Sequence, residues 1–240
     1  MRTVAVAVRV LQQLRRDPRT LILIVAVPCL LETLLRELFR GGPQFQHVGA
    51  PLLGLFPLVT MFLVTSITML RERTSGTLER LMTMPLAKFD LLAGYGCAFA
   101  LLAALQITVV SAVTFGLLGL ETAGPRWLVA ALAVANAVLG CALGLFVSAF
   151  AQTEFQAVQF MPAFVLPQIL LCGLFVPRDE MATWLRWISA VMPLTYAYDA
   201  LARAAANTLD ARFAADVAVV CGCIALSLVL GAATLRRRTA

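Results

Sequence analysis

Two long stretches of this chain carry no charged side chain, and they constrain its fold more than any other feature. Residues 48–70 and 91–120 contain no Asp, Glu, Lys or Arg. Each is long enough to cross the hydrocarbon core of a bilayer, which takes about 20 apolar residues in a helix. The whole chain is 61% hydrophobic and only 13% charged, whereas soluble domains are about one quarter charged. The sequence therefore predicts an integral membrane protein made of α-helices.

We expect one transmembrane domain over residues 1–240 with six spanning helices. Residues 32–37 make the first span the least regular, because Glu32, Arg36 and Glu37 interrupt it. Glu32 and Arg36 are four residues apart and are expected to pair on one helix face, and Pro28 is expected to kink the helix. The predicted spans are residues 20–39, 49–70, 91–119, 127–150, 155–176 and 215–235.

The distribution of basic residues predicts the orientation. With six spans, both termini lie on one side, together with the charged stretch at residues 71–88. Most Arg residues and Lys88, the only lysine, fall on that side, which the positive-inside rule identifies as the cytoplasm. Residues 1–20 contain no apolar run resembling a cleavable signal peptide, so we expect the first span to be retained.

An amphipathic helix is predicted over residues 1–18, lying along the inner membrane surface. Asp17 and Pro18 should end it and turn the chain into the first span. Its polar arc contains Arg2, Arg9, Gln12, Gln13 and Arg16, and its apolar arc contains Val4, Ala7, Val8, Leu11 and Leu14.

A second irregular segment, residues 177–214, is expected on the outer side. Its aromatic residues are of the kind found near lipid headgroups, and Pro193 divides it. We interpret it as two short re-entrant helices that dip into the outer leaflet; the alternative is an ordinary surface loop. Its marker residues are Pro177, Trp184, Pro193 and Tyr196.

The charged stretch between the second and third spans, within residues 71–90, predicts a short cytoplasmic helix. Gly76 supplies backbone freedom, Thr77 suits an N-cap, and Glu79 in the first turn favours the helix dipole. An apolar ridge follows at helical spacing, and Pro85 discourages helix just before it. The ridge consists of Leu78, Leu81 and Met82. Such a ridge suits a groove on another protein, although a solvated loop is also consistent with it.

At these residues the chain resembles the ABC-2 type transporter permeases, the membrane subunits of ATP-binding-cassette exporters, including the daunorubicin-resistance type. The similarity includes the Gly-Thr-Leu-Glu core at residues 76–79, Pro28, and a late pattern that contains Phe175 and Leu194. It implies that the segment is a coupling helix that docks on an ATPase subunit. The residues assigned to it are Glu72, Arg73, Gly76, Thr77, Leu78, Glu79, Leu81, Met82 and Pro85.

The chain itself is not expected to be an enzyme. A nucleotide-binding P-loop needs Gly-Lys, and Lys88 follows Ala87. The resemblance implies that ATP and Mg²⁺ bind two copies of a separate ATPase, that a second, identical or homologous permease completes the path, and that the complex lies in a bacterial plasma membrane. No cofactor, metal or nucleic acid is expected on this chain. His47 is the only histidine, and the six cysteines lie in apolar runs, typical of buried hydrophobic residues.

Two other functions are alternatives for such a chain. A membrane enzyme would need a nucleophile with a base, paired carboxylates or metal ligands, and no such set is evident. An ion-coupled carrier or channel would place ionisable groups inside the membrane; Glu32 and Glu37 are the candidates, and Arg36 would neutralise one of them.

The uncharged spans favour an amphipathic or apolar substrate, a drug or antibiotic rather than a lipid or polysaccharide. We expect the fifth span to contribute to the path, and ordinary helix packing is the alternative reading of the same residues. The path residues are Phe160, Met161, Phe164 and Gln168.

Overall fold

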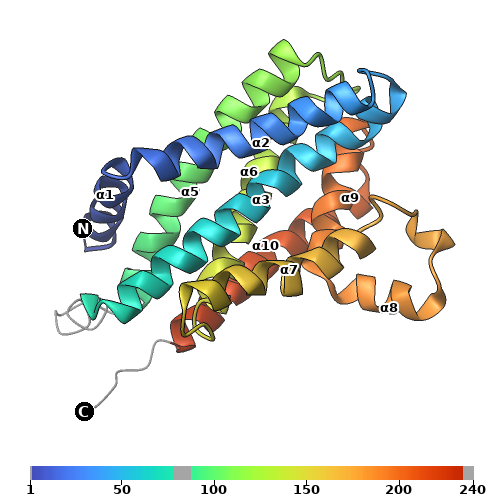
Figure 1. The fold of residues 1–240 in the computed structure, drawn as a ribbon. Helices are drawn as coiled ribbons and strands as arrows, with labels where there is room; N and C mark the ends of the chain where they lie inside the picture. The colour runs from blue at the N-terminus through green and yellow to red at the C-terminus, as the bar shows by residue number, and fades with distance from the viewer. Residues whose placement is uncertain (1, 78–87, 235–240) are drawn as a thin grey trace.

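The computed structural model describes residues 2–77 and 88–234, and within them the chain is helical throughout (Figure 1). Nine α-helices occur in this described part, together with a π-helix, η1, and a short 3₁₀ helix, η2. Their bounds are α1 Arg2–Arg15, α2 Pro18–Leu38, α3 Pro43–Thr74, α5 Lys88–Ala112, η1 Val113–Leu117, α6 Arg126–Val147, α7 Glu154–Leu171, η2 Arg178–Glu180, α8 Thr183–Val191, α9 Pro193–Ala205 and α10 Ala211–Thr234.

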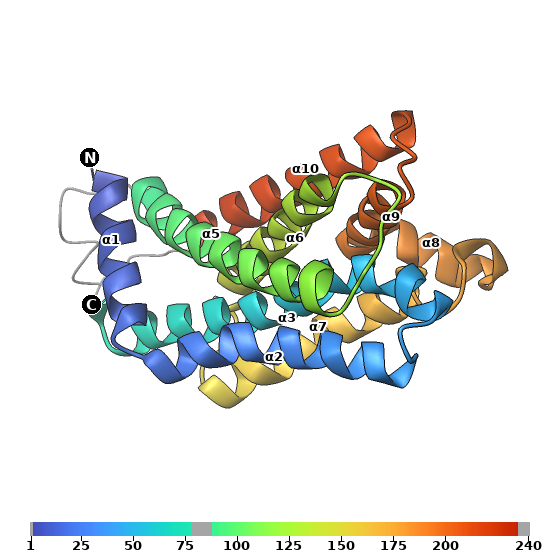
Figure 2. The same ribbon diagram turned by 90° about the horizontal axis from the view of Figure 1, so that it is seen from above.

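Six long helices, α2, α3, α5, α6, α7 and α10, run along one another, and α1 lies across one end of the bundle (Figures 1 and 2). The end of α3 at Thr74 and the end of α10 at Thr234 lie at the same end as α1. The short helices α8 and α9 lie at the opposite end, with the turn between α2 and α3. The charged stretch after α3 therefore starts at the end that carries α1.

Among the helices of the described residues, four have the length and apolar composition of membrane spans: α3, residues 93–117 of α5 and η1, α6 and α10. They match the second, third, fourth and sixth predicted spans. The first and fifth correspond to α2 and α7, which contain 21 and 18 residues, or about 32 and 27 Å at 1.5 Å per residue. Both are more polar, α2 through Glu32, Arg36 and Glu37 and α7 through Glu154 and its glutamines.

Two helices differ from their predicted spans at the ends. Helix α3 starts at Pro43, six residues before the predicted 49, because a proline at the first helical position leaves no donor unsatisfied. Helix α7 ends at Leu171 instead of 176, since Gly173 takes a φ of +105°, a backbone angle that breaks a helix. The segment after α7 is thus longer than the sequence predicted.

The tightest packing in the bundle is between α3 and α6. A Cβ atom at Gly140 would lie 2.3 Å from the Leu58 carbonyl oxygen, and one at Gly144 would lie 2.5 Å from that of Phe62. These distances leave no room for a side chain. The Gly-x-x-x-Gly spacing lets two membrane helices approach backbone to backbone, so α3 and α6 form the centre of the bundle.

Other helix faces are apolar and exposed, as expected for contact with lipid or a partner helix. On α10, Leu226 and Val229 are exposed, and most of this helix lies at the periphery. Cys97 on α5 and Cys221 on α10 also point outward. The expectation that all six cysteines are buried is therefore wrong for these two, because their apolar helices have outward faces.

Helix α1 packs on protein with a face that only partly overlaps the predicted apolar arc, of which Ala7 and Leu14 are buried. Val6, Val10 and Leu14 are buried, and Val6 sits so close to Gly94 of α5 that a Cβ there would lie 2.6 Å from its Cβ. Val4 and Val8, assigned to the apolar arc, are exposed. The helix is rotated because Arg9, assigned to the polar arc, bonds inward to α3.

Candidate functional site

The base of α3 is the start of the predicted coupling segment. The helix continues through Arg71, Glu72 and Arg73 to Thr74, and Gly76 then adopts a φ of +69°. Only glycine takes this angle readily, so the predicted role of Gly76 in the turn is confirmed. Thr77 is already helical and shares a 2.9 Å hydrogen bond with Ser75 through their hydroxyls. Leu78, Glu79, Leu81, Met82 and Pro85 lie outside the described residues.

Glu72 binds α1 and is not presented to the surrounding solvent. The Nη2 atom of Arg9 donates hydrogen bonds to both carboxylate oxygens of Glu72, at 3.0 Å to Oε1 and 2.9 Å to Oε2. Gln13 donates a further hydrogen bond of 3.0 Å to Oε1. Because Glu72 is 5% exposed, it ties α1 to α3 within this chain and leaves little surface for contact with another subunit.

Two further acidic residues, exposed Glu154 and half-buried Asp17, complete this end of the molecule. Arg71 forms a two-bond ion pair with Glu154 at the start of α7, with distances of 2.7 and 3.0 Å. Asp17 caps α2 by accepting hydrogen bonds from the backbone and hydroxyl of Thr20, and these bonds lower the pKa of its carboxyl. Arg73 is half-buried, and its Nε and Nη2 have no hydrogen-bond partner among the residues described.

A groove of about 460 Å³ lies between α1, α2 and the base of α3. Its wall is mixed in character, with apolar Val10 and Leu14 beside polar Gln13 and Arg71. Thr77 lies at its edge, so the groove adjoins the point where the coupling segment begins. The sequence did not predict this groove, because three separate helices form it.

The four residues predicted for the substrate path do not share one surface. Phe160 and Met161 are half-buried against the core, while Phe164 is 39% exposed. Gln168 is buried, donates to the Phe164 carbonyl and accepts a 3.4 Å bond from the backbone of Leu194 at the start of α9. Its contacts join α7 to α9.

An apolar groove of about 390 Å³ lies instead between α2, α3 and the end of α7. None of the four predicted path residues lines it. Its wall consists of Leu35, Phe39, Val48, Leu52, Leu55, Phe56, Val59, Ile169, Leu174 and Phe175. The early end of α7 at Gly173 brings the last two residues into the groove, a break that the apolar sequence does not signal.

Residues 177–214 contain two short helices, as predicted, with Pro193 starting the second. Trp184 on α8 is exposed, and the Tyr196 hydroxyl donates a 2.7 Å bond from α9 to the Ala190 carbonyl. Buried Ser189 donates to the Leu171 carbonyl at 2.9 Å, so the corner is fixed to the end of α7. Pro177 caps the short η2 turn.

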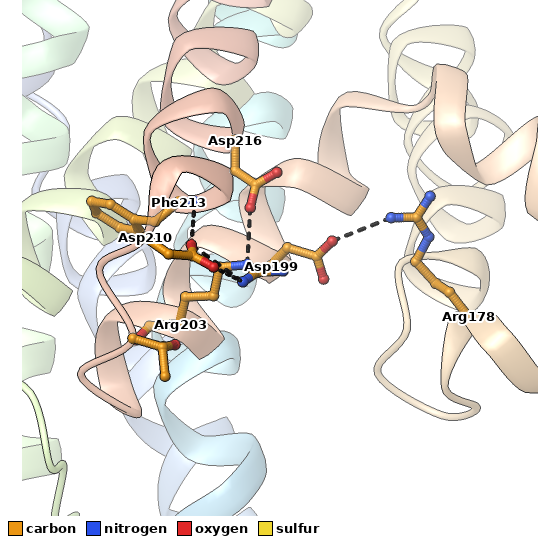
Figure 3. Close-up of polar contacts among 7 residues, drawn as sticks. Arg178, Asp199, Arg203, Asp210, Phe213 and Asp216 are labelled. Atoms are coloured by element: carbon orange, nitrogen blue, oxygen red, sulfur yellow. Dashed lines mark hydrogen bonds and ion pairs between the residues drawn. The ribbon is translucent and has the colours of Figure 1, made fainter.

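A charged cluster that the sequence did not predict joins η2, α9 and α10 (Figure 3). Arg178 pairs with Asp199 at 3.2 Å, and Arg203 pairs with Asp210 and Asp216, each at 3.2 Å. Burial raises the pKa of Asp199 despite the nearby arginines, whereas the backbone N–H of Phe213 lowers that of Asp210. The cluster fixes the outer segment to α10.

The comparisons with known proteins identify the type of chain. A family model described as ABC-2 type transporter matches residues 1–205. The chain is similar to a protein of Escherichia coli strain K12 named probable multidrug ABC transporter permease YbhR. The two are 26% identical over 169 residues, which is 70% of this chain and 46% of that protein.

Two further relatives come from other organisms. One is the linearmycin resistance permease protein LnrN of Bacillus subtilis strain 168, which is 26% identical over 187 residues, 76% of this chain and 47% of its own length. The other is ABC transporter G family member 20 of Dictyostelium discoideum, 26% identical over 138 residues, 58% of this chain and 19% of its own length. The chain thus spans about half the length, or less, of the curated relatives it matches.

Proposed function

This chain belongs to the ABC-2 type transporter family, and from that premise we propose that it is the permease of an exporter that moves amphipathic or apolar molecules out of the cell. ATP is hydrolysed by a separate ATPase polypeptide, present in two copies, and a second permease chain completes the complex. The observation that carries the proposal is the family match over residues 1–205, together with a charged segment that leaves the base of α3 beside α1.

The proposed topology has six spans with both termini in the cytoplasm. The more polar α2 and α7 count as spans because they run beside the four apolar helices and are close to spanning length (Figure 2). The basic residues at 2–19 and 71–73 lie at one end of the bundle, which supports placing that end inside. Helices α8 and α9 are then outer re-entrant elements. Buried contacts of α9 support this, since such elements persist only where protein covers their backbone.

The coupling role is assigned to the segment that begins at Gly76. Helix α3 ends at Thr74 and is followed by the turn at Gly76, and the groove beside Thr77 offers a surface for a partner. Arg73 and the ridge residues Leu78, Leu81 and Met82, with Glu79, would contact the ATPase. Glu72 acts differently from its predicted role: it holds α1 against α3, so that α1 and the coupling segment move together.

The substrate class is inferred from the surface of the apolar groove. Its wall between α2, α3 and α7 carries no charged residue, and this favours apolar or amphipathic molecules over polysaccharides. The names of two relatives, multidrug permease and linearmycin resistance permease, support a drug or antibiotic as the substrate. The proposed path also includes three residues of α7 that lie outside this groove: Phe160, Met161 and Phe164.

The test is recovery of the ATPase with the tagged chain from solubilised membranes. Leu81→Asp places a charge on the apolar ridge and is expected to abolish recovery of the ATPase and export. Gln152→Asp is the matched control, because Gln152 is exposed at the same end of the bundle and outside the coupling segment. Equal recovery of an ATPase with both variants would refute the coupling role. No ATPase with the wild-type chain would refute the proposal as a whole.

A further inference from the structure

Helix α2 and the α5–η1 pair run in the same direction and keep a constant register. Gln106 donates a 2.8 Å hydrogen bond to the carbonyl of Ile24, 82 residues away. Nearer the outer end, Arg36 donates a 3.0 Å bond to the carbonyl of Leu118, again 82 residues away. The same offset between these two contacts places Glu32 level with Thr114.

Both of these side chains are sealed inside the protein. Glu32 and Thr114 are each 0% exposed. Among the residues described, neither carboxyl oxygen of Glu32 has a hydrogen-bond partner, and the hydroxyl of Thr114 has none either. Ser111, one turn before Thr114, is also buried with an unpartnered hydroxyl. A buried carboxylate without a partner is strongly unfavourable, so Glu32 needs a proton or another cation to neutralise it.

No cationic side chain of the described helices pairs with the carboxyl of Glu32. The predicted pair between Glu32 and Arg36 is wrong: Arg36 bonds the Leu118 carbonyl and pairs with Glu37. Facing helix α3 carries no charged side chain over residues 48–70, and α5 with η1 carries none over 91–117. His47 is exposed at the outer end of α3, and α1 crosses the opposite end of α2. On α2 itself, the titratable neighbour one turn away is Cys29.

The backbone beside Glu32 is irregular. Residues 113–117 form a π-helix, in which Leu118 donates to the carbonyl of Val113 and Leu120 to that of Thr114. π-Helical turns are often found at functional sites. In membrane transporters, backbone carbonyls of unwound helices coordinate the coupling ion. Carboxylate, hydroxyl and carbonyl oxygens form a donor set for a small, hard cation.

We propose that Glu32 and Thr114, with Ser111 nearby, form a binding site for a small monovalent cation, H⁺ or Na⁺, inside the bundle. The bound cation neutralises Glu32 and holds α2 against η1, where α5 converges on α2 (Figure 2). Because the site is sealed, exchange of the cation requires α2 and η1 to separate. This inference goes beyond the proposed export function, because export by the ATPase does not by itself require an ion.

The first test is thermal unfolding of the full chain, purified in detergent with any subunit that accompanies it. NaCl is exchanged for choline chloride at constant ionic strength, and the series is repeated across pH. If Na⁺ is the ligand, the Tm rises with Na⁺, by about 5–10 °C at a concentration about 100 times its Kd. If H⁺ is the ligand, the Tm falls as pH rises and ignores Na⁺.

Matched variants locate the effect. Glu32→Gln keeps the shape of the side chain without its charge. The Tm of this variant is expected to lose its dependence on Na⁺ or on pH. Thr114→Val should weaken that dependence. Glu37→Gln is the control, because Glu37 is an acid on the same helix whose side chain is 65% exposed. A Glu37→Gln variant that loses the dependence as Glu32→Gln does would overturn the assignment.

The second test needs no variant. Dicyclohexylcarbodiimide, an apolar reagent, modifies protonated carboxyl groups inside membranes, and the modified peptide is identified by mass spectrometry. We expect modification at Glu32 and not at Glu37, slowed by Na⁺ if Na⁺ binds. If H⁺ binds, modification should fall about tenfold per pH unit above the titration midpoint. An unmodified Glu32, with a wild-type Tm independent of both Na⁺ and pH, would overturn the proposal.

Discussion

Arg9 and Glu72 form the contact that ties α1 to the base of α3, and its strength can be worked from the geometry. Arg9 makes two bonds of 3.0 and 2.9 Å to the Glu72 carboxylate. Removing one partner of a buried pair costs about 3–5 kcal/mol. The side chain of Glu72 is 6% exposed, but that of Arg9 is 30% exposed, and Gln13 keeps one bond. We therefore expect the lower value, about 3 kcal/mol, for Arg9→Ala.

The loss should be larger for one partner than for the other. In Arg9→Ala the buried Glu72 carboxylate keeps only Gln13, whereas in Glu72→Gln the released guanidinium of Arg9 can reach water. For a chain of this size, about 3 kcal/mol corresponds to a Tm lower by about 6–12 °C. Glu72→Gln is expected to lower the Tm by less than half of that amount.

The assay is thermal unfolding of the purified chain in detergent, with Arg15→Ala as the control. Arg15 is exposed at the end of the same helix, and its removal is expected to change stability by less than about 1 kcal/mol. A double-mutant cycle with Glu72→Gln should give a coupling energy of about 2 kcal/mol. A Tm for Arg9→Ala equal to that of Arg15→Ala, or a coupling below about 0.5 kcal/mol, would refute the reasoning.

Other contacts lead to three further predictions. Gly140→Ala is expected to destabilise the chain by more than the usual 1–3 kcal/mol for overpacking, because its Cβ would lie 2.3 Å from the Leu58 carbonyl oxygen. Gly222→Ala, where a Cβ meets open space, should be neutral or stabilising by up to about 1 kcal/mol in the same unfolding assay. Leu174→Trp should narrow the apolar groove and reduce drug export from cells, while Leu170→Trp on the exposed face of α7 should not. The lowered pKa of Asp17 means that its cap stabilises the chain above the ordinary Asp pKa and that this contribution is lost as pH falls through the folded value. Tm differences between wild type and Asp17→Ala should therefore shrink on acidification, and a constant difference would contradict the capping role.

The helices themselves could be predicted because composition and charge determine them. Uncharged runs identified α3, α5 and α6 to within several residues. The return of charged residues at Arg71 indicated the nearby turn, where Gly76 takes a positive φ. Proline positions were less informative. Pro51 and Pro57 lie within α3 without ending it, because packing against neighbouring helices compensates for a lost hydrogen bond in a membrane helix.

Pairings between side chains were harder to predict, because sequence spacing describes only neighbours on one helix. Spacing favours a Glu32–Arg36 pair, yet Arg36 bonds the carbonyl of Leu118, the residue that follows η1. Spacing also favours a pair between Asp199 and Arg203, four residues apart on α9, yet Arg203 pairs with Asp210, just before α10, and with Asp216 within it (Figure 3). In both cases the arginine bonds a partner distant in the sequence instead of the acid four residues away.

The packing also indicates which helices move together. Helix α3 has 32 residues, about 48 Å at 1.5 Å per residue, and reaches from the turn after α2 to the start of the proposed coupling segment. Its backbone contacts with α6 at Gly140 and Gly144 leave no space for sliding, so we expect α3 and α6 to move as one body. Helices α2 and α7 border α3 along an apolar groove, and buried Glu32 of α2 has no hydrogen-bond partner among the described residues. A push on the coupling segment should therefore be carried by α3 and α6, together with α1, and should open the bundle where α2 and α7 meet them.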